Sequence, residues 1–412
     1  MNRRTPLPIR SIVGQLVIGS AGFLVLVGAL AFAAQEPTAL ERAKNPVASF
    51  TDIGEQAGLT MTNVFGGVDT KKYIIETTGT GIAIFDYDND GWPDIFIVNG
   101  TTLEGFPADK APTNHLYHNN HDGTFTDVTE KAGIVGTGWG QGVCVGDYDN
   151  DGWEDLYVTY YGKNRLYHND HGVFTEVAEK AGVAGSGKAW GTGCAFIDFN
   201  RGGHLDLFVA NYVDFNLPTA PTPGEGTSCT WKGVPVMCGP RGLRGSKNIL
   251  YENRGDGTFR DVTTKAHIDR TNGHFAFSVS TLDFDDDGWP DIYVACDSAP
   301  SILYHNNRDG TFTDIAVMAG VAFNEDGREK PAWELQWQTT MVTGASTFSR
   351  PIFQMTLQHC IATKAPEFFL MSPIAPAWGD IRNIWGGALC FLTSIMTVGR
   401  ILSSLTATCT RK

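Results

Sequence analysis

The chain is poor in basic residues and carries an excess of acid. Its 412 residues contain 31 lysines and arginines against 45 aspartates and glutamates, which gives a formal net charge of −14. A protein of this sign is repelled by phosphate backbones, which argues against nucleic acid as a partner. The acidic excess instead suits a secreted protein that binds cations. Aromatic residues make up 11% of the chain, too many for a disordered protein.

Sequence signatures of enzymes are also missing. The chain has no GxSxG, no HExxH, no phosphate-binding loop and no dinucleotide-binding fingerprint. His204 and His274 are isolated in the sequence and are not accompanied by a candidate nucleophile. We therefore expect no catalytic activity. The alternative is a polysaccharide lyase, which would need a base and a charge-neutralising cation in one pocket.

Long hydrophobic runs are scarce, and the clearest one lies near the N-terminus. Arg3, Arg4 and Arg10 precede an uncharged run over residues 12–34 that ends in small residues. This order of segments is typical of a secretory signal, but the run is also long enough for an uncleaved membrane anchor. We expect a signal peptide or anchor over residues 1–34 and a linker over 35–48. The protein would then be secreted, periplasmic or held at the cell surface.

Cysteine is sparse, with 8 residues. Cys229 and Cys238 lie in an insert rich in glycine and proline, and we expect a disulfide between them outside the cell. Cys144 and Cys194 lie in apolar segments just before acidic loops. For these two we expect buried thiols that pack as small hydrophobic groups.

The most informative feature of the chain is an internal repeat. The string FDYDNDGWPDIFIV, which begins at Phe85, recurs as GDYDNDGWEDLYV, IDFNRGGHLDLFV and LDFDDDGWPDIYV. A second string, LYHNNHDGTFTDVTEKAG (Leu116–Gly133), alternates with the first and has three further copies. Repeats of about fifty residues are typical of propellers and solenoids.

The local pattern within each repeat indicates four short strands. LYxN and TFxDV flank a turn, and an apolar run stands before and after each acidic loop. Four strands form one blade of a β-propeller. The sequence therefore predicts an all-β chain with four to five blades over residues 49–329, an incomplete ring, and a loop-like insert over residues 212–248. A lone FTDI at residues 50–53 would supply an outer strand to another blade.

The acidic loops have the composition of a calcium site. Asp-x-Asp-x-Asp-Gly offers hard oxygen ligands at positions 1, 3, 5 and 9 and a backbone carbonyl at position 7, which suits Ca²⁺. The third loop has Gly202 at position 5, so we expect weaker binding there. The expected ligands, with carbonyls at position 7, are Asp86, Asp88, Asp90, Trp92 and Asp94; Asp147, Asp149, Asp151, Trp153 and Asp155; Asp198, Asn200, His204 and Asp206; and Asp283, Asp285, Asp287, Trp289 and Asp291.

A second candidate cluster is formed by His115, His118 and His121, which stand three residues apart. The residues that correspond to His118 in the other repeats are His168, Glu252 and His305. Because this position recurs within the repeat, we favour a role at the repeat surface over a metal site.

The loops and the Phe-Thr-Asp-Val/Ile strands resemble the FG-GAP/VCBS repeat family, which includes integrin-α-like propellers. The insert motif VPVMCGPRGL (Val234–Leu243) is similar to that of bacterial cartilage acidic protein-like members, which usually carry a C-terminal ASPIC/UnbV domain. No such domain is expected in this chain. The resemblance covers residues 49–329 and implies a seven-bladed, extracellular, Ca²⁺-loaded propeller used in adhesion or in binding a protein or glycan. The insert, with Arg241 and Arg244, is the expected contact surface.

The repeat pattern stops at Glu329. Reverse translation of residues 330–412, read from the third base of each codon, can restore two further acidic loops. Two of the restored residues are forced because methionine has a single codon: Met341-Val342 yields a glycine and Met396-Thr397 an aspartate, each at its proper loop position. The sequence therefore predicts that residues 330–412 are a frameshifted, non-native tail that is disordered or packs badly.

Resequencing of the gene across codons 325–335 tests this prediction. We expect a missing or extra base whose correction continues the repeat. An unchanged reading frame in both genomic DNA and transcript would contradict the frameshift.

Overall fold

The computed structural model describes residues 51–67, 71–221, 229–231, 233–236, 239–240, 242–271, 273–324, 327–329, 337–339 and 353–355. All of these residues belong to one compact unit. The expected signal or anchor and the linker lie outside them, as does most of the expected tail. Within the tail, β19 (Trp337–Thr339) and β20 (Phe353–Met355) pair antiparallel. No helix in the described part is long and apolar enough to cross a membrane.

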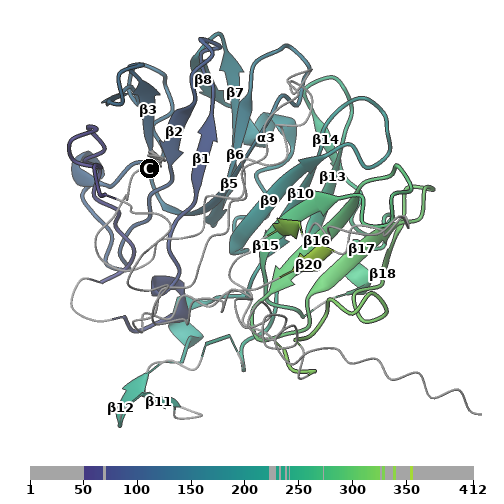
Figure 1. Ribbon diagram of the computed structural model, residues 1–412. Helices are drawn as coiled ribbons and strands as arrows, with labels where there is room; N and C mark the ends of the chain where they lie inside the picture. Colours follow the sequence, from purple (N-terminus) through teal and green to yellow (C-terminus); the bar gives the residue numbers. More distant parts are fainter. Residues whose placement is uncertain are drawn as a thin grey trace, which may run out of the picture. The chain divides into compact units, whose positions relative to one another are not determined.

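Each of the four repeats folds into a four-stranded antiparallel sheet, here called a blade (Figure 1). Blade 1 comprises β1 (Ile82–Phe85), β2 (Asp94–Ile97), β3 (His115–Asn119) and β4 (Phe125–Asp127). Blade 2 comprises β5 (Trp139–Gly146), β6 (Asp155–Tyr161), β7 (Arg165–Asp170) and β8 (Val173–Glu176). Blade 3 comprises β9 (Gly191–Ile197), β10 (Asp206–Asn211), β13 (Ile249–Asn253) and β14 (Phe259–Asp261). Blade 4 comprises β15 (Ala276–Leu282), β16 (Asp291–Cys296), β17 (Ile302–Asn306) and β18 (Phe312–Asp314).

The other described elements are short. The insert between β10 and β13 contains a hairpin of β11 (Cys229–Trp231) and β12 (Val234–Val236). Single helical turns stand at η1 (Ile74–Glu76), η2 (Ala108–Lys110), α3 (Ala178–Ala181), η3 (Leu217–Thr219) and η4 (Ile268–Arg270). The predicted all-β fold of propeller blades, forming an incomplete propeller, is therefore confirmed.

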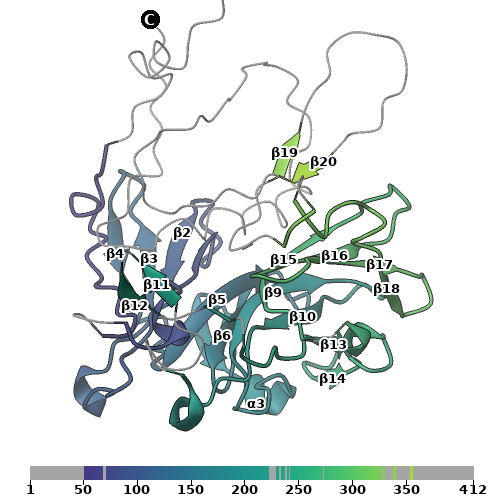
Figure 2. The same ribbon diagram turned by 90° about the horizontal axis from the view of Figure 1, so that it is seen from below.

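The blades stand next to one another through their first strands. β1 contacts β5, β5 contacts β9, and β9 contacts β15. The order from β5 through β9 to β15 can be followed in Figure 2. Hydrophobic clusters fill the space between neighbouring blades, so that Phe85 and Tyr87 of blade 1 pack on Phe174 of blade 2. The second strand of each blade is covered on both faces. This explains why its sequence is an uninterrupted apolar run rather than an alternating one.

A disulfide joins Cys144 in β5 to Cys194 in β9, so the expectation of two separate buried thiols was wrong. The first strands of blades 2 and 3 are neighbours, and this brings the two Cα atoms to 5.8 Å, within the range that a disulfide requires. Because the bond closes a loop of about 50 residues, chain entropy predicts about 4 kcal/mol of stabilisation. Cys229 is also disulfide-bonded. Its expected partner, Cys238, lies outside the described residues.

The segment that follows the lone FTDI packs on blade 1. The N–H of Phe125 donates to the carbonyl of Ala57 (2.7 Å), just as the N–H of Phe174 donates to Ala132 of blade 1 (2.7 Å). The segment around Ala57 therefore contacts blade 1 in the same way as the segment after β4, around Ala132, contacts blade 2. Its pairing as an outer strand of another blade stays a prediction.

An asparagine in the third strand of blades 2, 3 and 4 connects each of these blades to the preceding one. Asn169 Nδ2 donates to the carbonyl of Glu154 in its own blade and to that of Tyr87 in blade 1. Asn253 and Asn306 repeat this arrangement in blades 3 and 4. In blade 1, Asn119 Nδ2 donates to its own blade, at the carbonyl of Pro93, and to no other blade in the described part of the chain.

The contribution of this contact can be isolated by comparing two alanine variants. Asn119→Ala and Asn169→Ala each remove two hydrogen bonds of the same kind. One is donated by Nδ2 to a carbonyl of the same blade, and the other is accepted by Oδ1 from an N–H of the following turn. Only Asn169→Ala also leaves the buried Tyr87 carbonyl unpaired. We expect Asn169→Ala to lower the free energy of unfolding in urea by about 1–2 kcal/mol more than Asn119→Ala. Equal losses would contradict an inter-blade role.

Candidate metal centre

Each acidic loop connects the first two strands of a blade. The four loops are loop 1 (residues 86–94), loop 2 (147–155), loop 3 (198–206) and loop 4 (283–291). In loop 1 the chain reverses through Asn89 and Gly91, which have positive φ values of 56° and 88°. The first carboxylate then closes the turn, because Asp86 Oδ1 accepts the N–H of Asp90 (3.0 Å) and Oδ2 accepts that of Gly91 (2.8 Å). Asp147, Asp198 and Asp283 make the same pair of bonds.

The carboxylate at position 9 lies at the base of each loop and is fully buried. Asp94 accepts the N–H of Tyr87 and that of Asn119 (3.2 and 2.7 Å), so it joins the loop to the third strand. Asp155, Asp206 and Asp291 occupy the same place in the other blades.

Burial raises the pKa of these carboxylates although each accepts two N–H bonds. The pKa of Asp94 rises to about 6, that of Asp206 to about 7 and that of Asp155 to about 8. The pKa of Asp149 at position 3 is raised as well, by burial and then by the charge of Asp151. A cation next to these carboxylates would favour their ionised form. It would therefore offset the effects of burial and of neighbouring negative charge on the pKa.

Histidines of the third strand lie beside the loop carboxylates, and their role at the repeat surface stays a prediction. His118 Nδ1 lies 3.2 Å from Asp88 Oδ2 and 3.4 Å from Asp94 Oδ1. His168 Nδ1 repeats these distances, at 3.2 Å from Asp149 and 3.4 Å from Asp155. His115, by contrast, pairs with Asp127 outside the loop (2.6 Å). The spacing of three residues therefore does not define a cluster of three histidines.

Four buried atoms in or beside loops 1 and 2 have no hydrogen-bond partner among the described residues. They are Asp88 Oδ1 and His118 Nδ1 in blade 1, and Asp149 Oδ1 and His168 Nδ1 in blade 2. Both histidine nitrogens lie within reach of carboxylates, but neither contact has hydrogen-bond geometry. Since buried polar atoms are rarely left unpaired, a missing partner is indicated. A divalent cation held by these residues would provide one, so the residues fit the predicted ion.

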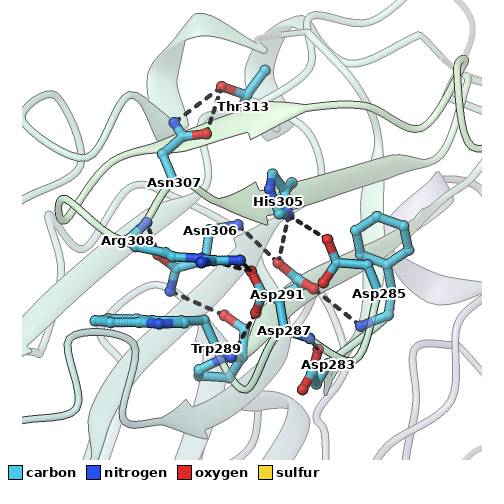
Figure 3. Close-up of polar contacts among 12 residues, drawn as sticks. Asp283, Asp285, Asp287, Trp289, Asp291, His305, Asn306, Asn307, Arg308 and Thr313 are labelled. Atoms are coloured by element: carbon cyan, nitrogen blue, oxygen red, sulfur yellow. Dashed lines mark hydrogen bonds and ion pairs between the residues drawn. The ribbon is translucent and has the colours of Figure 1, made fainter.

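Position 5 differs among the loops. In loop 4, Arg308 Nε and Nη2 donate to Asp287 Oδ2 (2.9 and 2.6 Å), as Figure 3 shows. In loop 1, His121 Nε2 lies 2.6 Å from Asp90 Oδ2, and its ring stacks on Trp92. Asp151 of loop 2 accepts the N–H of Trp153, and no described side chain of opposite charge contacts it. Among the three loops with an acid at position 5, loop 2 therefore has the least neutralised set of carboxylates in the described part of the chain.

Loop 3 differs from the others at two places. Position 5 is Gly202, and its N–H donates to Asn200 Oδ1 (2.7 Å). Glu252 stands where the other blades have histidine, and its carboxylate pairs with Arg260. Loop 3 thus offers fewer free carboxylate oxygens, in line with the weaker binding expected for it.

Position 4 connects each loop to the next one, a contact that the sequence patterns did not reveal. Asn89 Nδ2 donates to the carbonyl of Gly152 in loop 2 (3.0 Å), and Asn150 Nδ2 to that of Gly203 in loop 3 (2.8 Å). The guanidinium of Arg201 lies 5.3 Å from the ring centroid of Trp289 in loop 4. The four loops therefore form one continuous row. The available signal was the polar or charged residue that stands at position 4 of every loop, namely Asn89, Asn150, Arg201 and Asp286.

The model of the FG-GAP-like repeat matches residues 86–158, 147–209, 237–294 and 283–328, which together make up just over half of the chain. The chain belongs to the FG-GAP-like repeat family. Three of the four matched FG-GAP-like segments begin at the first aspartate of an acidic loop, namely Asp86, Asp147 and Asp283. The family model therefore follows the repeat found in the sequence, with these segments beginning directly after the first strand of a blade.

Among known proteins, the chain is similar to cartilage acidic protein 1. It is 25% identical to that protein from Xenopus tropicalis, over 58% of this chain and 43% of the relative. It is also 25% identical to the Homo sapiens protein, over 58% of this chain and 35% of the relative. The chain thus spans less than half the length of these FG-GAP-like relatives.

Solved structures show a more distant likeness. A lectin of Agrocybe aegerita that recognises non-reducing terminal N-acetylglucosamine has a TM-score of 0.31 and 17% identity, over 56% of this chain and 49% of its own. The rhamnogalacturonan lyase PL11 of Bacillus licheniformis has a TM-score of 0.31 and 14% identity, over 61% of this chain and 44% of its own. Likeness at this level carries no argument about function.

Loop 2 offers a test of cation binding. We expect excess Ca²⁺ to raise the free energy of unfolding of the whole chain, by about 2.7 kcal/mol per loop at a hundredfold excess over Kd. Asp149→Asn should lose the part of this stabilisation that Ca²⁺ binding to loop 2 contributes, about 2.7 kcal/mol. In chelator, the same variant should be at least as stable as the unchanged protein, because it relieves repulsion from Asp147 and Asp151.

Asp122→Asn is the matched control, since Asp122 caps an exposed turn outside the loops. In Ca²⁺, the free energy of unfolding of this variant should rise as much as that of the unchanged protein. A cation site would be contradicted if each of the three proteins melted at the same temperature in Ca²⁺ as in chelator.

Proposed function

We propose that the chain is an extracellular calcium-binding propeller module that binds a protein or glycan and has no catalytic activity. One observation carries the proposal: Asp88 Oδ1 and Asp149 Oδ1 are buried at the same position of two loops, and neither has a hydrogen-bond partner among the residues that the structure describes. Each is surrounded by further carboxylates that repel one another unless a cation neutralises them. Ca²⁺ fits best because it prefers several oxygen ligands in a flexible loop.

The proposed ions would have a structural task. Carboxylates at positions 1 and 9 close the loop and connect it to the third strand. Position 4 connects the loop to the next blade. An ion that holds the remaining carboxylates would therefore stabilise the row of loops and the contacts between blades. This favours a role in rigidity and adhesion over a role in catalysis.

Disulfides support export of the protein. Cys144 is bonded to Cys194, and Cys229 also forms a disulfide. Such bonds persist in oxidising compartments and are rare in the cytosol. They agree with a signal or anchor over residues 12–34 and with a location in the periplasm, at the cell surface or in the medium.

The insert between β10 and β13 is the proposed contact surface. Its base is well anchored, because Val213 pairs with Gly245 and Ser246 Oγ donates to Asp214 Oδ1 (2.6 Å). Figure 1 shows the β11–β12 hairpin outside the four blades. Arg244 has 84% of its side chain exposed and forms an ion pair with Asp214 at 3.4 Å. Arg241 lies outside the described residues.

Removal of the insert tests the binding role. Replacement of residues 217–242 by a short glycine–serine linker should abolish binding to glycan arrays and to cell surfaces. It should preserve the stabilisation by Ca²⁺, because the loops lie elsewhere in the chain. Unchanged binding without the insert would sink the assignment of this surface. The lyase alternative predicts instead that polysaccharide is cleaved, with unsaturated sugar ends detected by ultraviolet absorbance.

A further inference from the structure

The histidines next to the acidic loops recur at one position of three blades. His118 in β3, His168 in β7 and His305 in β17 each lie beside the position-3 and position-9 aspartates of their own blade. For His305 these are Asp285 (3.9 Å) and Asp291 (3.2 Å), as Figure 3 shows. A side chain with a nitrogen ligand therefore accompanies each complete loop.

We propose that these histidines are metal ligands, so that loops 1, 2 and 4 accept a first-row transition-metal ion in addition to Ca²⁺. The proposal rests on the proposed function, namely that the loops bind a divalent cation. It adds an imidazole nitrogen to ligand sets that the loop pattern alone describes as oxygen only.

The distances in blades 1 and 2 suit ligands of a common ion. Two neighbouring ligands with bonds of roughly 2.2 Å at right angles lie about 3.1 Å apart. His118 Nδ1 lies 3.2 and 3.4 Å from oxygens of Asp88 and Asp94, and His168 Nδ1 lies at the same two distances from its aspartates. In each blade the three groups thus converge without bonding to one another.

A simple hydrogen bond between histidine and aspartate is the competing explanation. It accounts for blade 4, where His305 Nδ1 makes a hydrogen bond of 3.2 Å to Asp291. It does not account for blades 1 and 2, where the buried Nδ1 atoms of His118 and His168 remain without a hydrogen bond. An ion between the nitrogen and the carboxylates would pair both partners at once.

Aromatic residues at position 2 hold the imidazole rings in place. The ring of Tyr87 meets that of His118 edge-on at 6.0 Å, and Tyr148 meets His168 in the same way at 6.2 Å. In blade 4, Phe284 takes this role against His305 at 5.7 Å. The ring direction is therefore set before any ion binds, as expected for a ligand that is oriented by its surroundings.

The ligand atoms decide which ion can distinguish a loop with a histidine ligand from a loop with oxygen ligands only. Ca²⁺ takes oxygen ligands, whereas imidazole suits first-row transition metals and carboxylates suit Mn²⁺. Two carboxylates and one imidazole therefore make Mn²⁺ the appropriate probe. Loop 3 has Glu252 in place of histidine and offers only oxygen ligands. It serves as an internal contrast within the same chain.

Pulsed electron paramagnetic resonance on the untagged full chain with Mn²⁺ tests the proposal. We expect nitrogen-14 coupling from a directly bound imidazole in the unchanged protein. The triple variant His118→Gln, His168→Gln and His305→Gln should lose the coupling, and its Mn²⁺ affinity should fall roughly tenfold or more relative to its Ca²⁺ affinity. The control His115→Gln should keep both, since His115 pairs with Asp127 outside the loop.

The outcomes separate this inference from the proposed function. Bound Mn²⁺ without nitrogen coupling in the unchanged protein, or coupling that survives in the triple variant, would overturn the histidine ligands and leave calcium binding intact. Failure of both Mn²⁺ and Ca²⁺ to bind in calorimetry would overturn both. The spectrum of the unchanged protein decides the matter even if the triple variant does not fold.

Discussion

The structure depends on one buried carboxylate in each blade, the aspartate at position 9 of the acidic loop. Asp94 accepts N–H bonds from the start of its loop and from the third strand, and it stands at the first residue of the second strand. One side chain thereby sets the path of the loop and the register of three strands. Asp155, Asp206 and Asp291 do the same in the other blades. Burying this charge is costly, and the neighbouring loop carboxylates add to the cost, so a cation among them would stabilise the ionised form.

Contacts between blades are built from the same repeat. The apolar second strand is buried between two neighbouring sheets, and the third-strand asparagine reaches a carbonyl of the preceding loop. The loops themselves are connected through position 4. A cation that orders one loop would consequently act on the interface with the next blade. Such coupling between neighbours is what gives repeat architectures their collective stability.

The two ends of the described row differ from its middle. At the first blade, the amide nitrogen of Asn119 bonds within its own blade and, among the residues described, to no neighbouring blade, whereas that of Asn169 does both. At the fourth blade, Val317 and Met318 are highly exposed, at a place where blades 1 and 2 have glutamate and lysine. The first blade thus lacks an inter-blade bond that the later blades have, and the fourth blade exposes apolar side chains where blades 1 and 2 expose charged ones.

The sequence by itself determined the number of described blades, their strands and the place of each acidic loop. These features follow from contacts between residues close in the chain, namely turns, hairpins and apolar runs, which recur with every repeat. The histidines at His118, His168 and His305 were visible in the repeat too. Their direction was not, because it depends on how the third strand pairs with the second.

Only the tertiary structure decided which repeats touch and where. The bond between Cys144 and Cys194 requires that the first strands of blades 2 and 3 be neighbours, and no local pattern states this. The same holds for the contact of Asn169 with Tyr87 and that of Asn89 with Gly152. A repeat pattern specifies the unit through short-range chemistry. The packing of one unit on the next selects the partners that lie far apart in the chain.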